Sequence, residues 1–232
     1  PLEVILETSK EQGGLGWSSS DYGFFAGSYG LINVFMLMLF FGGIILDKMG
    51  IRFTGVMASG LMVVGVIIKY FGVTTDFGDS KFTLDFVNFS LPMSAAIASL
   101  GFAIFGVGCE ICGITISKII TKWFTGHELA LAMGVQVGLA RLGTTAAMAG
   151  SLPLAKAFGN HVSAPILLGL VLLIAGFLAF IVYTVMDKKL DASTGEVTGN
   201  VSDEDEGFHF ADLKFIFTNP GFWCITLLCL MF

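Results

Sequence analysis

Apolar stretches long enough to cross a membrane alternate along the chain with short polar segments. The hydrocarbon core of a bilayer is about 30 Å thick, and a helix needs roughly 20 apolar residues to span it. Five stretches meet that length, and a sixth begins near Phe222. The pattern therefore predicts an all-α membrane protein. The five predicted membrane helices comprise residues 22–46, 53–71, 93–117, 129–154 and 163–186.

The polar segments between these helices give the expected division of the chain. Position 1 is Pro rather than Met, and the last apolar stretch is cut off at Phe232. We therefore expect a piece of a longer chain, with one membrane helix missing upstream. The expected parts are an external loop (1–20), a bundle of five membrane helices (21–186), a cytoplasmic loop (187–214) and the start of the next membrane helix (215–232).

The composition agrees with a polytopic membrane protein. Hydrophobic residues make up 55% of the chain and charged residues only 13%, with a mean hydropathy of +0.84. Soluble domains carry about 25% charged residues, so the composition excludes a disordered chain and an ordinary cytosolic enzyme. The formal net charge of −6 leaves no basic surface for a phosphate backbone. The bilayer is thus an expected partner, and nucleic acid is not.

Lys and Arg set the expected orientation, because they are enriched in cytoplasmic loops. Seven basic residues fall on one side of the predicted helices and four on the other, so we assign the first side to the cytoplasm. The first side carries Lys48, Arg52, Lys118, Lys122, Lys188, Lys189 and Lys214, and the second carries Lys10, Lys69, Lys81 and Lys156.

The turn between the first two predicted helices contains the strongest motif, formed by Gly43, Asp47, Lys48, Gly50 and Arg52. Gly43 lets another backbone approach, and Gly50 permits a tight reversal. Asp47 ends a helix, an unfavourable place for an anion unless a cation or another helix N-terminus receives it. Lys48 and Arg52 would lie at the lipid headgroups. The alternative interpretation is an ordinary loop on the positive side.

These five residues resemble the signature between helices two and three of the major facilitator superfamily. The resemblance implies that the five predicted helices are helices two to six of twelve and that the missing upstream helix is helix one. It further implies that a missing C-terminal half of the same chain is a partner. In that family the counterpart of Asp47 locks the two halves together on the cytoplasmic side, so the resemblance assigns the five residues to a gating motif.

Two charges lie inside the predicted helices, Glu110 and Arg141. Counted from Lys118 and Leu129, they lie roughly 12 and 18 Å from the same membrane side at a rise of 1.5 Å per residue. A lone charge near the midplane costs several kcal/mol, so each needs a polar partner inside the protein. The two would either form a fixed ion pair between helices or bind the amine and the carboxylate of a zwitterionic substrate.

Further polar side chains are expected near this depth. Tyr29 and Asn33 are four residues apart and share one face of the first predicted helix. Gln136 lies five residues before Arg141. We expect these side chains to line a substrate cavity, and hydrogen bonds between helices are the alternative.

Three segments, 106–110, 122–129 and 138–143, resemble more narrowly the branch typified by major facilitator domain-containing protein one. Its animal members are lysosomal dipeptide uniporters, so the resemblance implies that Glu110 reads the amino terminus of a peptide and that Arg141 takes part in polar substrate contacts. It implies a lysosomal membrane for an animal protein and the inner cell membrane for a bacterial one. Many superfamily members carry an Arg where this chain has Phe102, which puts proton coupling at that position in doubt.

The spans contain no Ser–His pair, paired Asp or zinc motif, and the chain has no Gly-rich phosphate loop. We therefore expect neither an enzyme nor a cofactor or metal. The favoured hypothesis is a transporter of small polar solutes such as dipeptides. The alternatives are a carrier of small organic or inorganic anions, with Arg141 as the anion receptor, and a non-transporting membrane scaffold or sensor.

Overall fold

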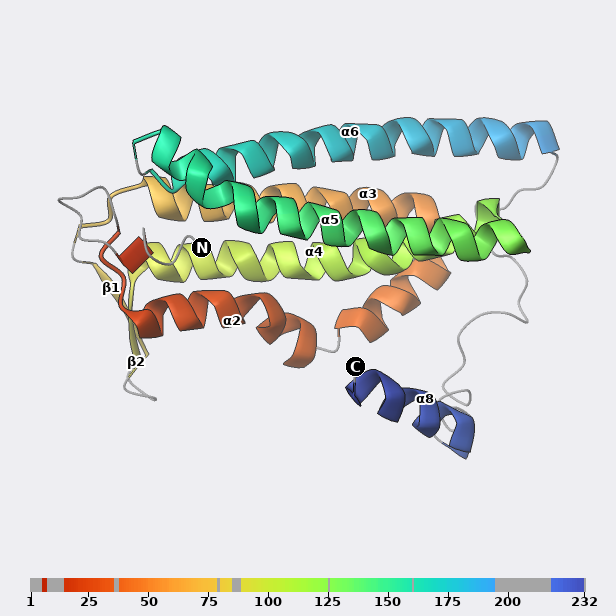
Figure 1. Cartoon of the computed structure of the whole chain (residues 1–232), viewed down its shortest axis with the longest axis horizontal. Coiled ribbons are helices and arrows are strands. Elements are labelled where there is room, and N and C mark those ends of the chain that lie inside the picture. Colours follow the sequence, from red (N-terminus) through yellow and green to blue (C-terminus); the bar gives the residue numbers. More distant parts are fainter. Residues whose placement is uncertain are drawn as a thin grey trace.

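The structure, a computed structural model, is a bundle of long helices that run back and forth across the molecule (Figure 1). It describes residues 6–7, 15–35, 38–78, 80–84, 89–124, 126–159, 161–194 and 218–231. The helices are α2 (Ser19–Phe35), α3 (Met38–Thr74), α4 (Met93–Trp123), α5 (His127–Ala157), α6 (Ser163–Thr194) and α8 (Pro220–Met231).

Four helices in the described ranges are long and apolar enough to cross a membrane. They cover the predicted helices 53–71, 93–117, 129–154 and 163–186, which confirms those four elements. The four comprise Phe40–Thr74, Met93–Trp123, Glu128–Ala157 and Ser163–Ala192.

The first predicted helix, 22–46, overlaps two described helices, α2, which is described to Phe35, and α3, which is described from Met38. Residues 36 and 37 lie outside the described part of the chain.

Gly50 interrupts α3 near the predicted turn. Its backbone angles, φ 78° and ψ 168°, are not helical and lie where residues with a side chain are strained. Figure 1 shows the chain reversing its direction between the first part of α3 and the rest of that helix. The expected tight reversal at Gly50 is therefore confirmed.

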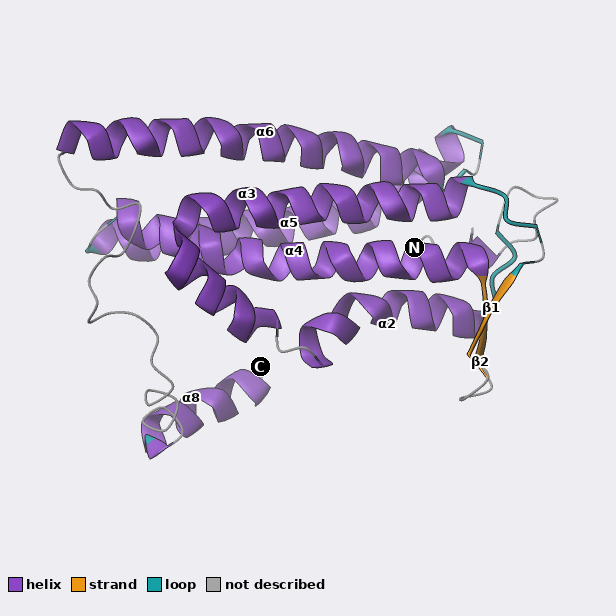
Figure 2. Cartoon of the chain, turned by 180° about the vertical axis from the view of Figure 1, so that it is seen from behind, coloured by secondary structure: helices purple, strands orange, loops and turns teal. Residues whose placement is uncertain are grey.

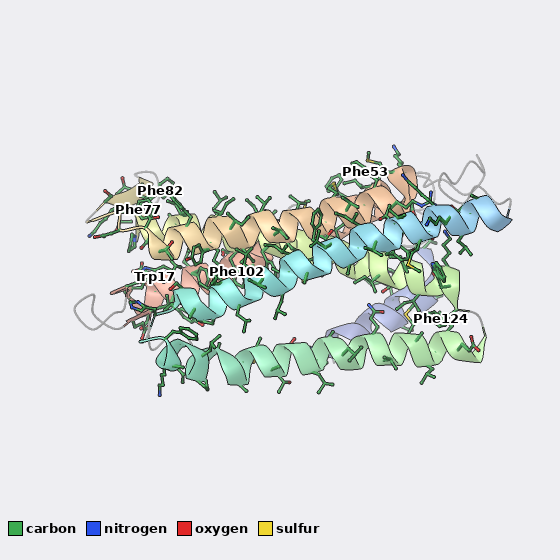
Figure 3. All side chains as sticks on the ribbon, turned by 90° about the horizontal axis from the view of Figure 1, so that it is seen from above. Trp17, Phe53, Phe77, Phe82, Phe102 and Phe124 are labelled. Atoms are coloured by element: carbon green, nitrogen blue, oxygen red, sulfur yellow. The ribbon has the colours of Figure 1, made fainter. Side chains whose placement is uncertain are left out.

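A two-stranded antiparallel hairpin connects α3 to α4, in a segment for which only a polar loop was predicted. Strand β1 (Lys81–Leu84) pairs with β2 (Phe89–Pro92). The hairpin and Trp17 lie at one end of the bundle, whereas Phe53 and Phe124 lie at the other (Figures 2 and 3). The short strands escaped prediction because four residues give too few alternations to distinguish them from a loop.

Helix α6 continues past the predicted end at residue 186 and reaches Thr194. The first eight residues of the expected loop 187–214 are thus helical. Among them, Asp187 and Asp191 form ion pairs with cations on α3 and α4, so this last part of α6 is fastened to its neighbours. The acidic run 203–206 lies outside the described residues.

Glycines bring α3 and α4 into backbone contact. A Cβ placed on Gly65 would lie 2.5 Å from the backbone nitrogen of Phe105, and one on Gly108 would lie 2.7 Å from the carbonyl oxygen of Ala58. Real Cβ atoms do not come this close, so only glycine fits at these points. Helix α4 also packs against α2, and α6 packs against α3. Helix α4 therefore lies between α2 and α3, and it carries Glu110 of the candidate site.

Candidate functional site

Glu110 on α4 forms a hydrogen bond with Tyr29 on α2. The Tyr29 hydroxyl donates to Glu110 Oε1 at 3.1 Å, and both side chains are partly buried. Helix α4 is one of the helices able to cross a membrane, so this contact places an acid and a phenol together inside the bundle. The sequence placed the two residues on separate helices without predicting their contact.

Close packing of α2 on α4 positions this pair. A Cβ on Gly106 would lie 2.6 Å from the carbonyl oxygen of Tyr29 and 3.1 Å from the Asn33 amide nitrogen. The Asn33 side chain donates to the Tyr29 carbonyl at 3.0 Å, and its own Oδ1 is buried with no partner among the described groups. A buried amide oxygen without a donor is costly. Asn33 therefore retains an acceptor beside Tyr29 that a ligand could use.

An aromatic cluster continues from Tyr29 toward the hairpin end of the bundle. It consists of Phe25, Tyr29, Phe102 and Phe105. The rings of Phe25 and Phe102 stack with centroids 5.0 Å apart, and Tyr29 is tilted on Phe102 at 5.4 Å. Phe105 extends the stack from Phe102 at 6.1 Å. The Glu110–Tyr29 pair thus borders a rigid apolar surface, an arrangement common in sites for small molecules.

Arg141 and Gln136 lie on α5, which packs much less tightly than the other long helices. Its most apolar stretch has no residue buried within the described chain. Arg141 is exposed and Gln136 is partly exposed. No ion pair between described residues joins Arg141 to Glu110. The fixed pair between helices, one of the two alternatives drawn from the sequence, is therefore not formed in this structure.

The residues of the predicted gating motif lie around the reversal at Gly50. Asp47 forms an ion pair with Lys118 on α4, whose Nζ lies 2.5 Å from Asp47 Oδ1. A cation therefore lies beside the carboxylate, as expected. Lys48 is exposed. A Cβ on Gly43 would meet no atom of the described chain within 4 Å, so the backbone expected to approach this glycine is not one of the described segments.

Arg52 pairs with two acids of α6, and the sequence did not predict these contacts. Its Nε donates to Asp187 Oδ2 at 2.7 Å, and its guanidinium also pairs with Asp191. The side chain is only 21% exposed. The buried carboxylate of Asp187 requires cations close by, and Arg52 is one of them.

Asp187 is the centre of a charge cluster that sequence reasoning missed. Its residue surface is 1% exposed, and it accepts from Arg52, from Lys122 Nζ at 2.8 Å and from the Tyr183 hydroxyl at 3.3 Å. Lys122 also reaches Asp191 at 3.3 Å. We call these five residues the charge clamp, because they join α3, α4 and α6 at one end of the bundle. Spacing could have revealed half of it, since positions 183, 187 and 191 share one face of a helix.

A pocket of about 350 Å³ lies at the opposite end of the molecule from the charge clamp. It is lined by the end of α3, the beginning of α4 and the hairpin, with Asp76, Lys81 and Ser94 among its polar residues. None of the residues predicted as substrate-binding lines this pocket.

Comparison with known proteins identifies the family. The profile described as the Major Facilitator Superfamily matches residues 5–232, nearly the whole chain. The chain belongs to the major facilitator superfamily. The resemblance of the Gly43–Arg52 motif is thereby confirmed, as is the all-α membrane fold. The chain is an integral, multi-pass membrane protein of a family of carriers rather than of enzymes.

Curated relatives cover part of the chain. It is 31% identical over 114 residues to the lysosomal dipeptide transporter MFSD1 of Danio rerio, 28% over 115 residues to that of Bos taurus and 26% over 114 residues to that of Homo sapiens. Each match spans 49% of this chain and 21% of the relative. The comparison supports the narrower resemblance to this branch. No solved structure matches the chain.

Proposed function

We propose that the protein transports small polar solutes, dipeptides in particular, by alternating access, and that this chain supplies part of the substrate site. The observation that carries the proposal is the hydrogen bond between Glu110 and Tyr29 inside the bundle. An ionisable group at membrane depth is costly and is retained where it serves transport. The MFSD1 relatives, named as lysosomal dipeptide transporters, support the choice of dipeptides.

In this proposal Glu110 binds the amino group of the peptide, and Tyr29 orients the carboxylate through its hydroxyl. The acceptor oxygen of Asn33 lies beside them and offers a second contact for an N–H group. Arg141 and Gln136 contact polar groups of the substrate from α5. In alternating access two bundles rock around a fixed site. Helix α5 makes few contacts with the other described helices, so its polar side chains could approach the substrate during this movement.

The gating motif belongs to the same proposal. Asp47, Lys48 and Arg52 lie around the reversal at Gly50, with Gly43 one turn before Asp47. Lys118 neutralises Asp47 within the chain, and the exposed pair is weak enough to exchange partners during transport. The membrane would be lysosomal in an animal cell and the inner cell membrane in a bacterium.

Uptake by the protein, expressed from its complete gene and reconstituted in proteoliposomes, tests the proposal. We expect uptake of a labelled dipeptide, with losses of at least about tenfold in both Glu110→Gln and Arg141→Ala, because charged hydrogen bonds contribute about 1.5–3 kcal/mol each. Glu128→Gln, an exposed acid at the start of α5, is the matched control and should retain uptake. Unchanged uptake in both site variants would refute the site assignment.

A carrier of small anions is the second candidate, favoured by the exposed guanidinium of Arg141, which forms no ion pair with a described residue. Competition separates the two functions. Simple carboxylates and amino-blocked peptides should displace the substrate of an anion carrier, whereas a dipeptide transporter requires the free amine. Thermal stabilisation by a dipeptide without any flux would instead indicate a sensor.

A further inference from the structure

Lys69 places a cation against the aromatic cluster. The residue lies on α3, and its ammonium nitrogen is 4.8 Å from the ring centroid of Phe102 and 5.5 Å from that of Phe25. The sequence counted Lys69 among the flanking charges on the second side of the membrane. In the structure its ammonium turns onto the rings of α2 and α4 instead.

The backbone crossing of α3 and α4 fixes this arrangement. A Cβ on Gly101 would clash with the backbone nitrogen of Lys69, so the main chains touch one residue before Phe102. The two rings are themselves stacked, which limits their movement. The ammonium therefore stays on the aromatic surface unless the Lys69 side chain changes its rotamer.

The Lys69 ammonium has no negatively charged partner among the described residues. Two aromatic faces stabilise an ammonium by less than its loss of hydration inside a bundle costs. An anion that is not one of these residues would neutralise the charge of the Lys69 ammonium. No hydrogen bond from the ammonium to a described residue is found, so an anion could accept from an N–H group that does not face the rings.

Lys69 and Glu110 present opposite charges along the same aromatic surface. Tyr29 links the two charged groups. Its hydroxyl binds Glu110, and its ring packs on Phe102, the ring that contacts the Lys69 ammonium. Phe102 and Glu110 are eight residues apart on α4, a rise of about 12 Å.

We propose that Lys69 is the receptor for the carboxylate of the peptide, opposite Glu110, which takes its amine. The assignment rests on the proposed function and adds a residue from α3 to the substrate site. The length of two residues comes from the proposed function, and this assignment adds the requirement for an unblocked C-terminus.

The test compares alanyl-alanine with its C-terminal amide in the reconstituted protein. In the wild type, we expect the free dipeptide to inhibit uptake of labelled dipeptide at a concentration at least about tenfold lower than its amide does. Lys69→Met keeps the length of the side chain on the rings and removes the charge. It should raise the inhibitory concentration of the free dipeptide about tenfold and leave that of the amide within twofold. Lys69→Arg should restore much of the preference.

Controls separate a substrate role from a structural one. Lys156→Met removes an exposed lysine near the end of α5 and should leave the inhibitory concentrations of both peptides unchanged. If Lys69 merely fastens helices or serves a carboxylate of the protein itself, Lys69→Met would weaken both inhibitors equally, and the assignment would be wrong. A wild type that takes up neither peptide refutes the proposed function together with this inference. Uptake with an unchanged preference in Lys69→Met refutes the inference alone.

Discussion

Asp187→Asn removes the charge at the centre of the clamp and leaves the shape of the side chain nearly unchanged. The carboxylate is 2% exposed and accepts from two cations and a hydroxyl, so the substitution leaves Arg52 and Lys122 short of negative charge. Breaking a buried ion pair costs about 3–5 kcal/mol. Arg52 and Lys122 are 21% and 20% exposed, and Asp191 continues to pair with both. The expected loss is therefore smaller, about 2–3 kcal/mol.

Thermal unfolding of the detergent-solubilised protein measures this loss. For a cooperative unit of about 150–250 residues, 1 kcal/mol corresponds to about 2–4 °C in Tm, so we expect Asp187→Asn to lower Tm by about 4–12 °C. Asp47→Asn is the matched control, because this acid also forms an ion pair but its side chain is 44% exposed. Its expected loss is below about 1 kcal/mol.

Arg52→Gln in the Asp187→Asn background gives an internal check. Both substitutions disrupt one network, so their combined loss should be clearly smaller than the two separate losses added together. If Asp187→Asn unfolds at the same temperature as Asp47→Asn, burial of Asp187 does not govern its contribution and the reasoning about the clamp is refuted.

Two further predictions concern glycines. Gly65→Ala should destabilise the fold by about 1–3 kcal/mol, because the added methyl group would lie 2.5 Å from the backbone nitrogen of Phe105 and the helices must separate. Gly138→Ala, which has open space around it in the described chain, should leave Tm unchanged in the same unfolding measurement, and equal behaviour of the two variants would contradict the close crossing. Gly50→Ala should cost about 1–3 kcal/mol through its positive φ and shift Tm accordingly, whereas no shift would show that the reversal tolerates a side chain.

The sequence was sufficient to predict the membrane helices that depend on length and hydropathy alone. Those signals are local, since about 20 apolar residues are needed wherever a helix crosses lipid. The reversal at Gly50 was predictable for the same reason, because a glycine flanked by charges marks a turn without reference to the rest of the chain. The hairpin between α3 and α4 was not, because its two strands have four residues each.

The contacts of the site depended on information that hydropathy does not contain. Glu110 and Arg141 were predicted at similar depths, yet the structure pairs Glu110 with Tyr29, because α4 packs on α2 at Gly106. The carboxylate of Asp187 lies far along the chain from its partner Arg52, and only the folded arrangement of α3 and α6 brings them together. In the sequence, Lys69 is a basic residue near the end of a predicted membrane helix. Its aromatic partners lie on two other helices, and the sequence gives no sign of these contacts.

The crossing of α3 and α4 at Gly65 and Gly101 has a consequence for how this protein can diverge. Lys69 lies one helical turn after the first glycine, and Phe102 directly follows the second. Any larger residue at either crossing point would slide the helices apart and carry the ammonium away from the ring. Natural variants that keep both Lys69 and Phe102 should therefore inherit both glycines with them, so that the four positions change as one unit.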